Sequence, residues 1–144
     1  MKATLLMIAL VASGGCASLE NKSSDQRRLE GVALTAGESA DVIEQEIRKA
    51  VNRPRGELNK GFLEEVTQLD IAEYQLTDVS SLAGLKNLNT LYLDNNQLTD
   101  ISPLMGLTQL KSLSLLFNPN LTKVEIDKLQ NALPNCRIYS NPKR

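Results

Sequence analysis

The sequence predicts an α/β repeat fold, a short solenoid in which each coil adds one strand to a curved parallel sheet. Hydrophobic positions recur every 22 residues, most clearly in residues 88–107 and 110–118, and the period runs back to Leu69. Each copy begins with the alternation of a half-buried strand and ends with hydrophobic residues at every third position. One coil cannot bury its own hydrophobic face, so the coils must stack into a continuous core.

The first half of each copy predicts a strand followed by a turn. Leu91 and Leu93 alternate with Tyr92, as expected for a strand with one buried face. Asn96 and Asn118 follow two successive strands, where a buried amide can satisfy backbone groups of the neighbouring coil. The pattern L-x-x-L-x-L-x-x-N, at a period within about 20–29 residues, resembles the leucine-rich repeat.

The second half of each copy predicts a tight helical return. In one copy the apolar residues at every third position are Leu98, Ile101, Leu104 and Leu107. This spacing suits 3₁₀ turns better than a full α-helix. Ser102 and Pro103 fit a helical start, in which a hydroxyl cap precedes a proline whose missing N–H costs nothing.

Composition and charge exclude several classes of function. A chain of 144 residues with a net charge of −1 is expected to form one domain and has no basic footprint for nucleic acid. Histidine is absent, which removes the commonest general base and metal ligand. No phosphate loop or zinc spacing occurs, so no cofactor or metal is expected and an enzyme is the least supported class. The two cysteines, Cys16 and Cys136, define no disulfide framework.

The first sixteen residues predict an export signal. Lys2 is followed by an apolar run and then by small residues that lead to Cys16. This arrangement resembles the lipobox of bacterial lipoproteins, which implies lipidation of Cys16, although Ser13 stands where an aliphatic residue is usual. Ala17 would then favour the outer membrane in a host with two membranes. The alternative is an ordinary secretory signal cut after Ala17, which would give a periplasmic or secreted protein.

Residues 17–38 predict a flexible tether, because they are polar and lack a sustained period. Residues 39–65 predict an N-terminal helical cap. Its first helix is expected to begin at Asp41, which forms a capping box with Glu44, and to end before Pro54. The expected inward-facing residues of that helix are Ile43, Ile47, Ala50 and Val51.

The cap and the repeats together resemble the internalin-type leucine-rich repeats of bacterial surface proteins. The resemblance covers about residues 41–141 and includes two repeat endings, Leu76-Thr-Asp-Val79 and Leu98-Thr-Asp-Ile101. In that family the N-terminal helices close one end of the core and the repeats bind other proteins. The first repeat departs from the pattern, since Tyr74 replaces the asparagine.

The end of the chain predicts a C-terminal cap made of a helix and a strand, within the unit that spans residues 66–144. Residues 122–133 read as a helix with Val124, Leu129 and Leu133 facing inward. Cys136 and Ile138 lie 23 residues after Leu113 and Leu115, which places them in a last strand. The complete expectation is a leucine-rich repeat solenoid of about four strands, with caps at both ends.

The side chains between the buried leucines should form columns on the open face of the sheet. One predicted column contains Asp70, Tyr92, Ser114 and Arg137, and the next contains Ala72, Asp94, Leu116 and Tyr139. The predicted protein-binding residues are Asp70, Tyr92, Asp94, Leu116, Phe117, Arg137 and Tyr139. Large apolar side chains on a solvated face favour a contact patch. The alternative is that Phe117 folds under the turn at Pro119 and Leu116 is an ordinary exposed residue.

These observations predict a lipid-anchored protein of the cell envelope that binds another protein. The expected partner is an unidentified protein or peptide, the lipid anchor would contact the membrane, and the chain is expected to be a monomer. A structural component of the envelope is the alternative.

Overall fold

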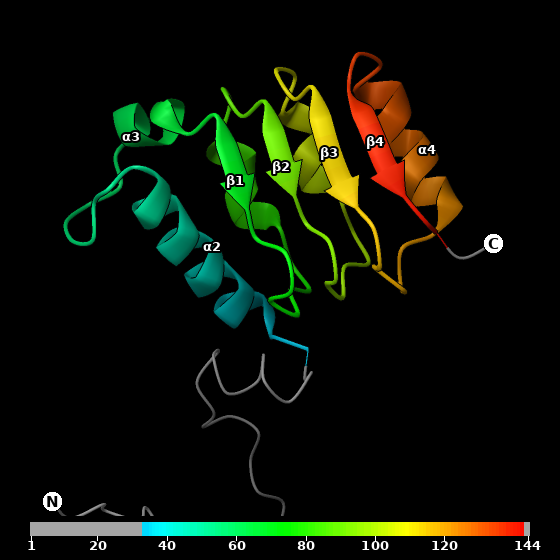
Figure 1. Ribbon diagram of the computed structural model, residues 1–144, viewed down its shortest axis with the longest axis horizontal. Helices are drawn as coiled ribbons and strands as arrows, with labels where there is room; N and C mark the ends of the chain where they lie inside the picture. Colours follow the sequence, from blue (N-terminus) through cyan, green and yellow to red (C-terminus); the bar gives the residue numbers. More distant parts are fainter. Residues whose placement is uncertain (1–32, 143–144) are drawn as a thin grey trace, which may run out of the picture.

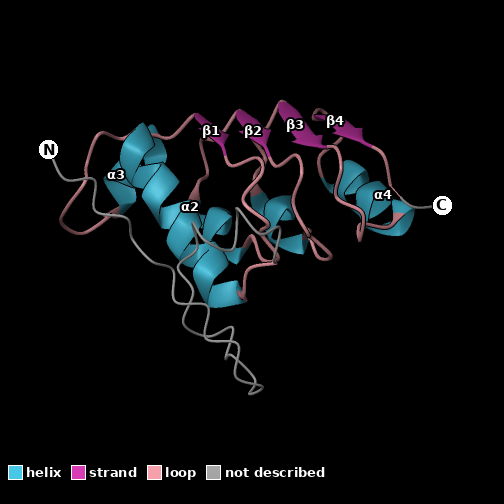
Figure 2. Ribbon diagram, turned by 60° about the horizontal axis from the view of Figure 1, so that its bottom comes forward, coloured by secondary structure: helices cyan, strands magenta, loops and turns pink. Residues whose placement is uncertain are grey.

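A parallel sheet of four strands in the order β1-β2-β3-β4 forms one side of the protein in the computed structural model, which describes residues 33–142 (Figure 1). The strands are β1 (Gln68–Asp70), β2 (Thr90–Tyr92), β3 (Ser112–Leu115) and β4 (Arg137–Ser140). The helical returns form the opposite layer (Figure 2). They are the 3₁₀ helices η2 (Ser80–Gly84) and η3 (Ser102–Gly106) and the α-helix α4 (Lys123–Ala132). The predicted solenoid is therefore confirmed.

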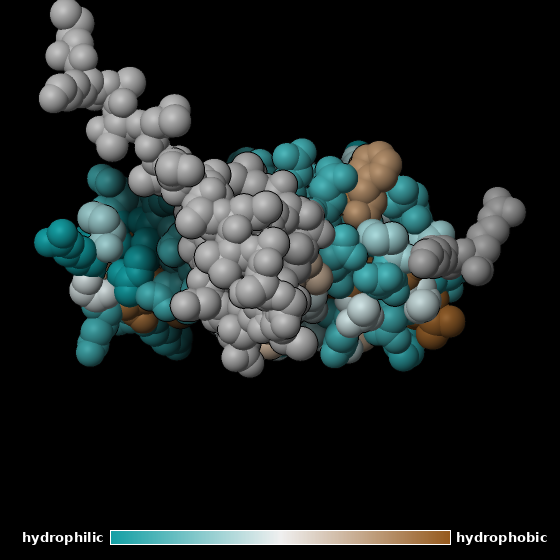
Figure 3. Space-filling model, turned by 90° about the horizontal axis from the view of Figure 1, so that it is seen from below, coloured by the Kyte–Doolittle hydropathy of each residue, from teal (hydrophilic) through white to brown (hydrophobic). Residues whose placement is uncertain are grey.

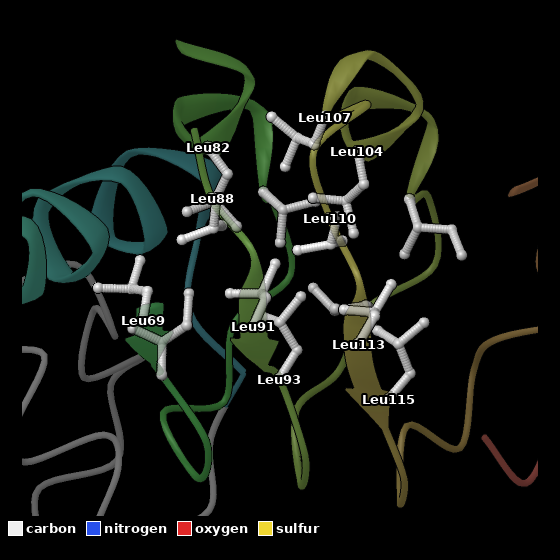
Figure 4. Close-up of a cluster of buried hydrophobic side chains, with 14 of the residues drawn as sticks. Leu69, Leu82, Leu88, Leu91, Leu93, Leu104, Leu107, Leu110, Leu113 and Leu115 are labelled. Atoms are coloured by element: carbon white, nitrogen blue, oxygen red, sulfur yellow. The ribbon is translucent and has the colours of Figure 1, made fainter. Parts of the chain in front are cut away.

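The core lies between the sheet and the helical returns. Strand residues Leu69, Leu91 and Leu113 stack across neighbouring coils and face the leucines of the returns (Figure 4). Leu91 and Leu113 have no exposed surface, and Leu69 is 3% exposed. Full burial of one leucine contributes about 1.5–3 kcal/mol. Because each leucine contacts the adjacent coil, this stabilisation depends on stacking.

Asn96 joins its own coil to the preceding one. Its Nδ2 donates to the carbonyl oxygens of Ile71 at 2.9 Å and Leu93 at 3.0 Å. Its Oδ1 accepts from the N–H groups of Tyr74 at 3.2 Å and Leu76 at 2.9 Å. The predicted role of the repeat asparagine is confirmed.

The first coil has no earlier coil to join, which explains why its asparagine is replaced. Tyr74 instead donates from its hydroxyl to Glu46 Oε1, at 2.7 Å, in the N-terminal helix α2 (Ala36–Ala50). In the third coil Asn118 repeats the pattern and donates to Leu93 at 2.9 Å. Tyr74, which replaces the asparagine in the first coil, thus connects the repeats to the N-terminal cap.

Helix α2 and the short helix α3 (Lys60–Glu65) close the β1 end of the core (Figure 1). The predicted start of α2 is wrong. The capping box joins Thr35 and Glu38, with Glu38 N–H to Thr35 Oγ1 at 3.3 Å and Thr35 N–H to Glu38 Oε2 at 2.9 Å. Ala50 is exposed rather than inward-facing.

The folded part extends further toward the N-terminus than the predicted boundary at residue 38. Leu34 is 2% exposed. Its N–H donates to the carbonyl oxygen of Gln75 at 2.9 Å, and its own carbonyl accepts from Thr77 Oγ1 at 2.6 Å. Residues 34–38, which the sequence pattern assigned to the tether, therefore belong to the cap. The predicted signal peptide, Cys16 and the rest of the tether lie outside the described residues.

The cap of helix η3 also differs from the prediction. The N-cap residue is Ile101, which makes no side-chain capping bond, and Ser102 is the first residue of the helix. The N–H of Ser102 donates to Asp100 Oδ1 at 2.8 Å. Side-chain and backbone hydrogen bonds from Ser102 lower the pKa of the Asp100 carboxyl below its usual value. Asp78 makes the same bond to Ser80 N–H, at 2.6 Å, in the preceding coil.

The C-terminal cap has a different register from the predicted one. Leu113 pairs with Ile138, and Ser114 with Tyr139, so β4 is displaced by two residues from the predicted 23-residue spacing. The cause is α4, a ten-residue α-helix where earlier coils have a five-residue 3₁₀ helix. Cys136 lies in the turn before β4, where its burial raises the pKa of the thiol.

The inward face of α4 also differs from the prediction at one position. Val124 is 60% exposed, and Ile126, at 9%, is buried in its place, whereas Leu129 and Leu133 are buried as expected. Within residues 33–142, no helix has both the length and the apolar character needed to cross a membrane.

Candidate functional site

One row of paired residues crosses the whole open face of the sheet. Asp70 pairs with Tyr92, Tyr92 with Ser114, and Ser114 with Tyr139. We call these four residues the tyrosine row. Their side chains lie on the face opposite Leu91 and the other buried leucines, because alternate residues of a strand point to opposite sides.

The tyrosine row places a small residue between two large ones. Tyr92 is 37% exposed and Tyr139 is 44% exposed, whereas Ser114 is only 7% exposed. Strands two positions apart in a sheet are separated by about 10 Å. The two tyrosines therefore stand on either side of the smaller, buried Ser114.

Asp94 holds Ser114, the small central residue of the row, in place. Its Oδ1 accepts from Ser114 Oγ at 2.5 Å and from the N–H of Leu116 at 2.9 Å. Asp94 is half-buried. We therefore assign this predicted binding residue a positioning role, in which it joins β3 to the preceding coil and orients Ser114.

The remaining predicted residues are only partly brought together. Asp70 is exposed at the β1 end of the row, where its Oδ1 accepts the N–H of Ala72 at 3.1 Å. Arg137 is exposed but pairs with Ser112, so it lies one row away from Tyr92 and Tyr139. The predicted grouping of Arg137 with Tyr92 in one column is wrong, because the register of β4 differs.

Leu116 and Phe117 follow β3 and behave differently from each other. Leu116 is half-buried, whereas Phe117 is 59% exposed. The alternative in which Phe117 folds under the turn is therefore wrong. Phe117 has a φ of 57°, a left-handed conformation that costs an L-residue with a Cβ about 1–2 kcal/mol.

The same left-handed position recurs where each of the first three strands leaves the sheet. Glu73 and Asn95 occupy it in the earlier coils, with φ values of 65° and 55°. Asparagine adopts this conformation several times more readily than most residues with a Cβ, phenylalanine included. The N–H of Phe117 donates to Asn141 Oδ1 at 2.7 Å, which helps to hold the turn.

Ser114 was placed correctly in one column with Asp70 and Tyr92, but it was not among the predicted binding residues. A lone serine between two buried leucines has no distinguishing pattern. Its position beside Tyr139 was missed because the predicted register of β4 was wrong. Among residues 33–142, no three His, Cys, Asp or Glu side chains are grouped as a metal site would require.

Comparison with known families and structures finds one family match. The model described as "Leucine Rich repeats (2 copies)" matches residues 64–104 and 86–135, which together cover half of the 144-residue chain. No curated protein matches the sequence.

Several solved structures are similar. Internalin C2 of Listeria monocytogenes str. 4b F2365 is 19% identical over 70% of this chain and 74% of its own, with a TM-score of 0.45. An internalin (inlF) of the same strain is 22% identical over 72% and 44%, with a TM-score of 0.43. A Clostridium perfringens ZmpB structure with CBM51-2 and INT domains is 28% identical over 53% of this chain, with a TM-score of 0.47. This chain spans only 16% of the clostridial chain.

Proposed function

This chain belongs to the leucine-rich repeat family, whose domains typically bind other proteins, and we propose that the open face of its sheet is the binding surface. The proposal is for a binding module rather than an enzyme. The tyrosine row is the centre of that surface, with Asp70 at one end and Tyr139 at the other.

The single observation that carries the proposal is the arrangement of Tyr92, Ser114 and Tyr139. Tyrosine is enriched among the residues that dominate binding energy, because its ring is large, apolar and rigid and its hydroxyl can form a hydrogen bond. The small Ser114 between the two rings leaves both of them accessible to a partner. Asp94 accepts hydrogen bonds from Ser114 and from the N–H of Leu116, which hold this part of β3 in place before the partner arrives.

The size of the open face limits the kind of partner. Four strands at about 4.8 Å spacing give a sheet some 15 Å across, and strands of three or four residues that rise about 3.3 Å per residue give a height of about 10–13 Å. The face therefore presents roughly 150–200 Å², well below the ~800 Å² per partner of a standard stable interface. We accordingly propose that it binds a short peptide segment or makes a transient contact.

We further propose that the protein acts at the cell envelope through a lipid on Cys16. The support is the sequence around Cys16, which resembles a lipobox. A lipid anchor suits a weak binder, because holding two partners on one surface raises their effective concentration. In a host with two membranes, the proposed site is the outer membrane.

Crosslinking in intact cells tests the binding surface. A photoreactive amino acid is placed at Tyr92 or Tyr139. The control position is Val124, which is also an exposed large hydrophobic residue, at 60%, but lies on α4 in the opposite layer. We expect one defined adduct from the two tyrosine positions and none from Val124. Absence of an adduct at both tyrosines, in a protein of high copy number, would instead favour a structural component of the envelope.

A further inference from the structure

A groove lies beside the open face, at the edge where the strands leave the sheet. It has a volume of about 440 Å³. Phe117 and Pro119 form its apolar part, and none of the lining residues within 33–142 is charged. The other described lining residues are five amides: Gln75, Asn95, Gln97, Asn118 and Asn141. Figure 3 views the molecule from this side, where the visible surface of the described residues is mostly hydrophilic with isolated hydrophobic positions.

Two of the amides are held in an ordered ladder. Asn120 Nδ2 donates to Gln97 Oε1 at 3.2 Å, and Gln97 Nε2 donates to Gln75 Oε1 at 3.2 Å. Each amide has two N–H donors and two acceptor positions on its oxygen. The ladder uses one donor and one acceptor of Gln97, so the same side chain has further hydrogen-bonding capacity in a fixed orientation.

The aromatic ring of the groove is also held in an exposed position. Phe117 is 59% exposed and adopts the left-handed conformation that Asn95 adopts one coil earlier. The turn does not require a phenylalanine, since asparagine fits this conformation better. The bond from Phe117 N–H to Asn141 Oδ1 fixes the backbone that carries the ring.

We propose that this groove binds an uncharged carbohydrate. A sugar ring has an apolar C–H face that can pack on the negative face of the Phe117 ring. Each sugar hydroxyl both donates and accepts, and the amides can meet both requirements. Because no charged residue of the described part of the chain lines the groove, a phosphate or a carboxylate is disfavoured as the principal ligand group. Preorganisation of the amide ladder reduces the ordering cost of binding.

The site is independent of the tyrosine row, so the two proposals can fail separately. The test titrates the purified full-length protein with neutral trisaccharides of glucose, galactose, mannose and N-acetylglucosamine, and follows side-chain amide signals by NMR. We expect at least one trisaccharide to shift the signals of Gln75 and Gln97. Tyr92→Ser, on the open face, should leave this response unchanged.

The decisive variant is Phe117→Asn, because it installs the residue found at the equivalent position of the preceding coil. It should weaken sugar binding by about tenfold or more, since the ring contact is lost, while the melting temperature stays the same or rises. Gln97→Leu should also weaken binding by breaking the ladder. The proposal is overturned if no trisaccharide binds, if Phe117→Asn binds as well as the wild type, or if Phe117→Asn instead abolishes capture of a protein partner.

Discussion

Asn96 donates a hydrogen bond of 2.9 Å from its side chain to the carbonyl oxygen of Ile71, one coil earlier. Both residues are fully buried. Removing the amide would take away the bond to this carbonyl and the bonds from the N–H groups of Tyr74 and Leu76, and each buried group left without a partner costs about 1–3 kcal/mol.

We therefore expect Asn96→Ala to lower the free energy of unfolding by at least about 3 kcal/mol. Chemical denaturation of the purified protein measures this change. Asn131→Ala is the matched control, because Asn131 is exposed on α4 and alanine is the better helix former there. Equal stabilities for the two variants would mean that the side-chain bonds of Asn96 do not join the coils.

Leu34 should stabilise the cap although it lies in a polar stretch. Leu34→Ala removes a side chain that is 2% exposed, and such substitutions cost about 2–5 kcal/mol. The melting temperature should fall clearly. Val124→Ala, on a side chain that is 60% exposed, should change it little. If Leu34→Ala behaved like Val124→Ala, the folded domain would begin after residue 34.

The Cys136 thiol should react slowly in the folded protein. Burial raises its pKa, so less of the reactive thiolate is present at a given pH. In a Cys16→Ser background, where Cys136 is the remaining cysteine, a thiol reagent at pH 8 should label the native chain much more slowly than the chain in denaturant. Similar rates in both states would contradict the buried position.

Cys16→Ser should abolish fatty-acid labelling and release the protein from the membrane fraction, because no other cysteine lies near a processed terminus. Metabolic labelling with a fatty acid, followed by fractionation, measures both effects. Cys136→Ser is the control and should retain the label. A wild-type protein that is unlabelled, with unchanged fractionation of the Cys16 variant, would rule out the anchor.

The repeat fold was predictable because its hydrophobic period is imposed by stacking. Buried positions such as Leu91 and Leu113 must recur at a fixed interval, since each occupies the same place in its coil. The register of β4 was not predictable in this way. Helix α4 replaces a 3₁₀ return and lengthens the path to the last strand. The spacing of the apolar residues Leu133 and Cys136 therefore matched the pattern of a strand, although neither residue lies in β4.

The start of the first helix was ambiguous for a different reason. Thr35 and Glu38 satisfy the capping-box pattern as well as Asp41 and Glu44 do. Only the tertiary contacts of Leu34 distinguish the two. The candidate surface was likewise only partly predictable. Tyr92 and Tyr139 were identified from their size and from the alternation, but the position of Ser114 between them required the observed pairing of β3 with β4.

The most direct test of the proposed binding surface measures the affinity of the crosslinked partner for the double variant Tyr92→Ser, Tyr139→Ser. The loss of two hot-spot rings should weaken binding by at least about thirtyfold. The melting temperature should be nearly unchanged, because both side chains are exposed, and Val124→Ser should bind like the wild type. Wild-type affinity in the double variant would contradict the assignment of the tyrosine row as the binding surface.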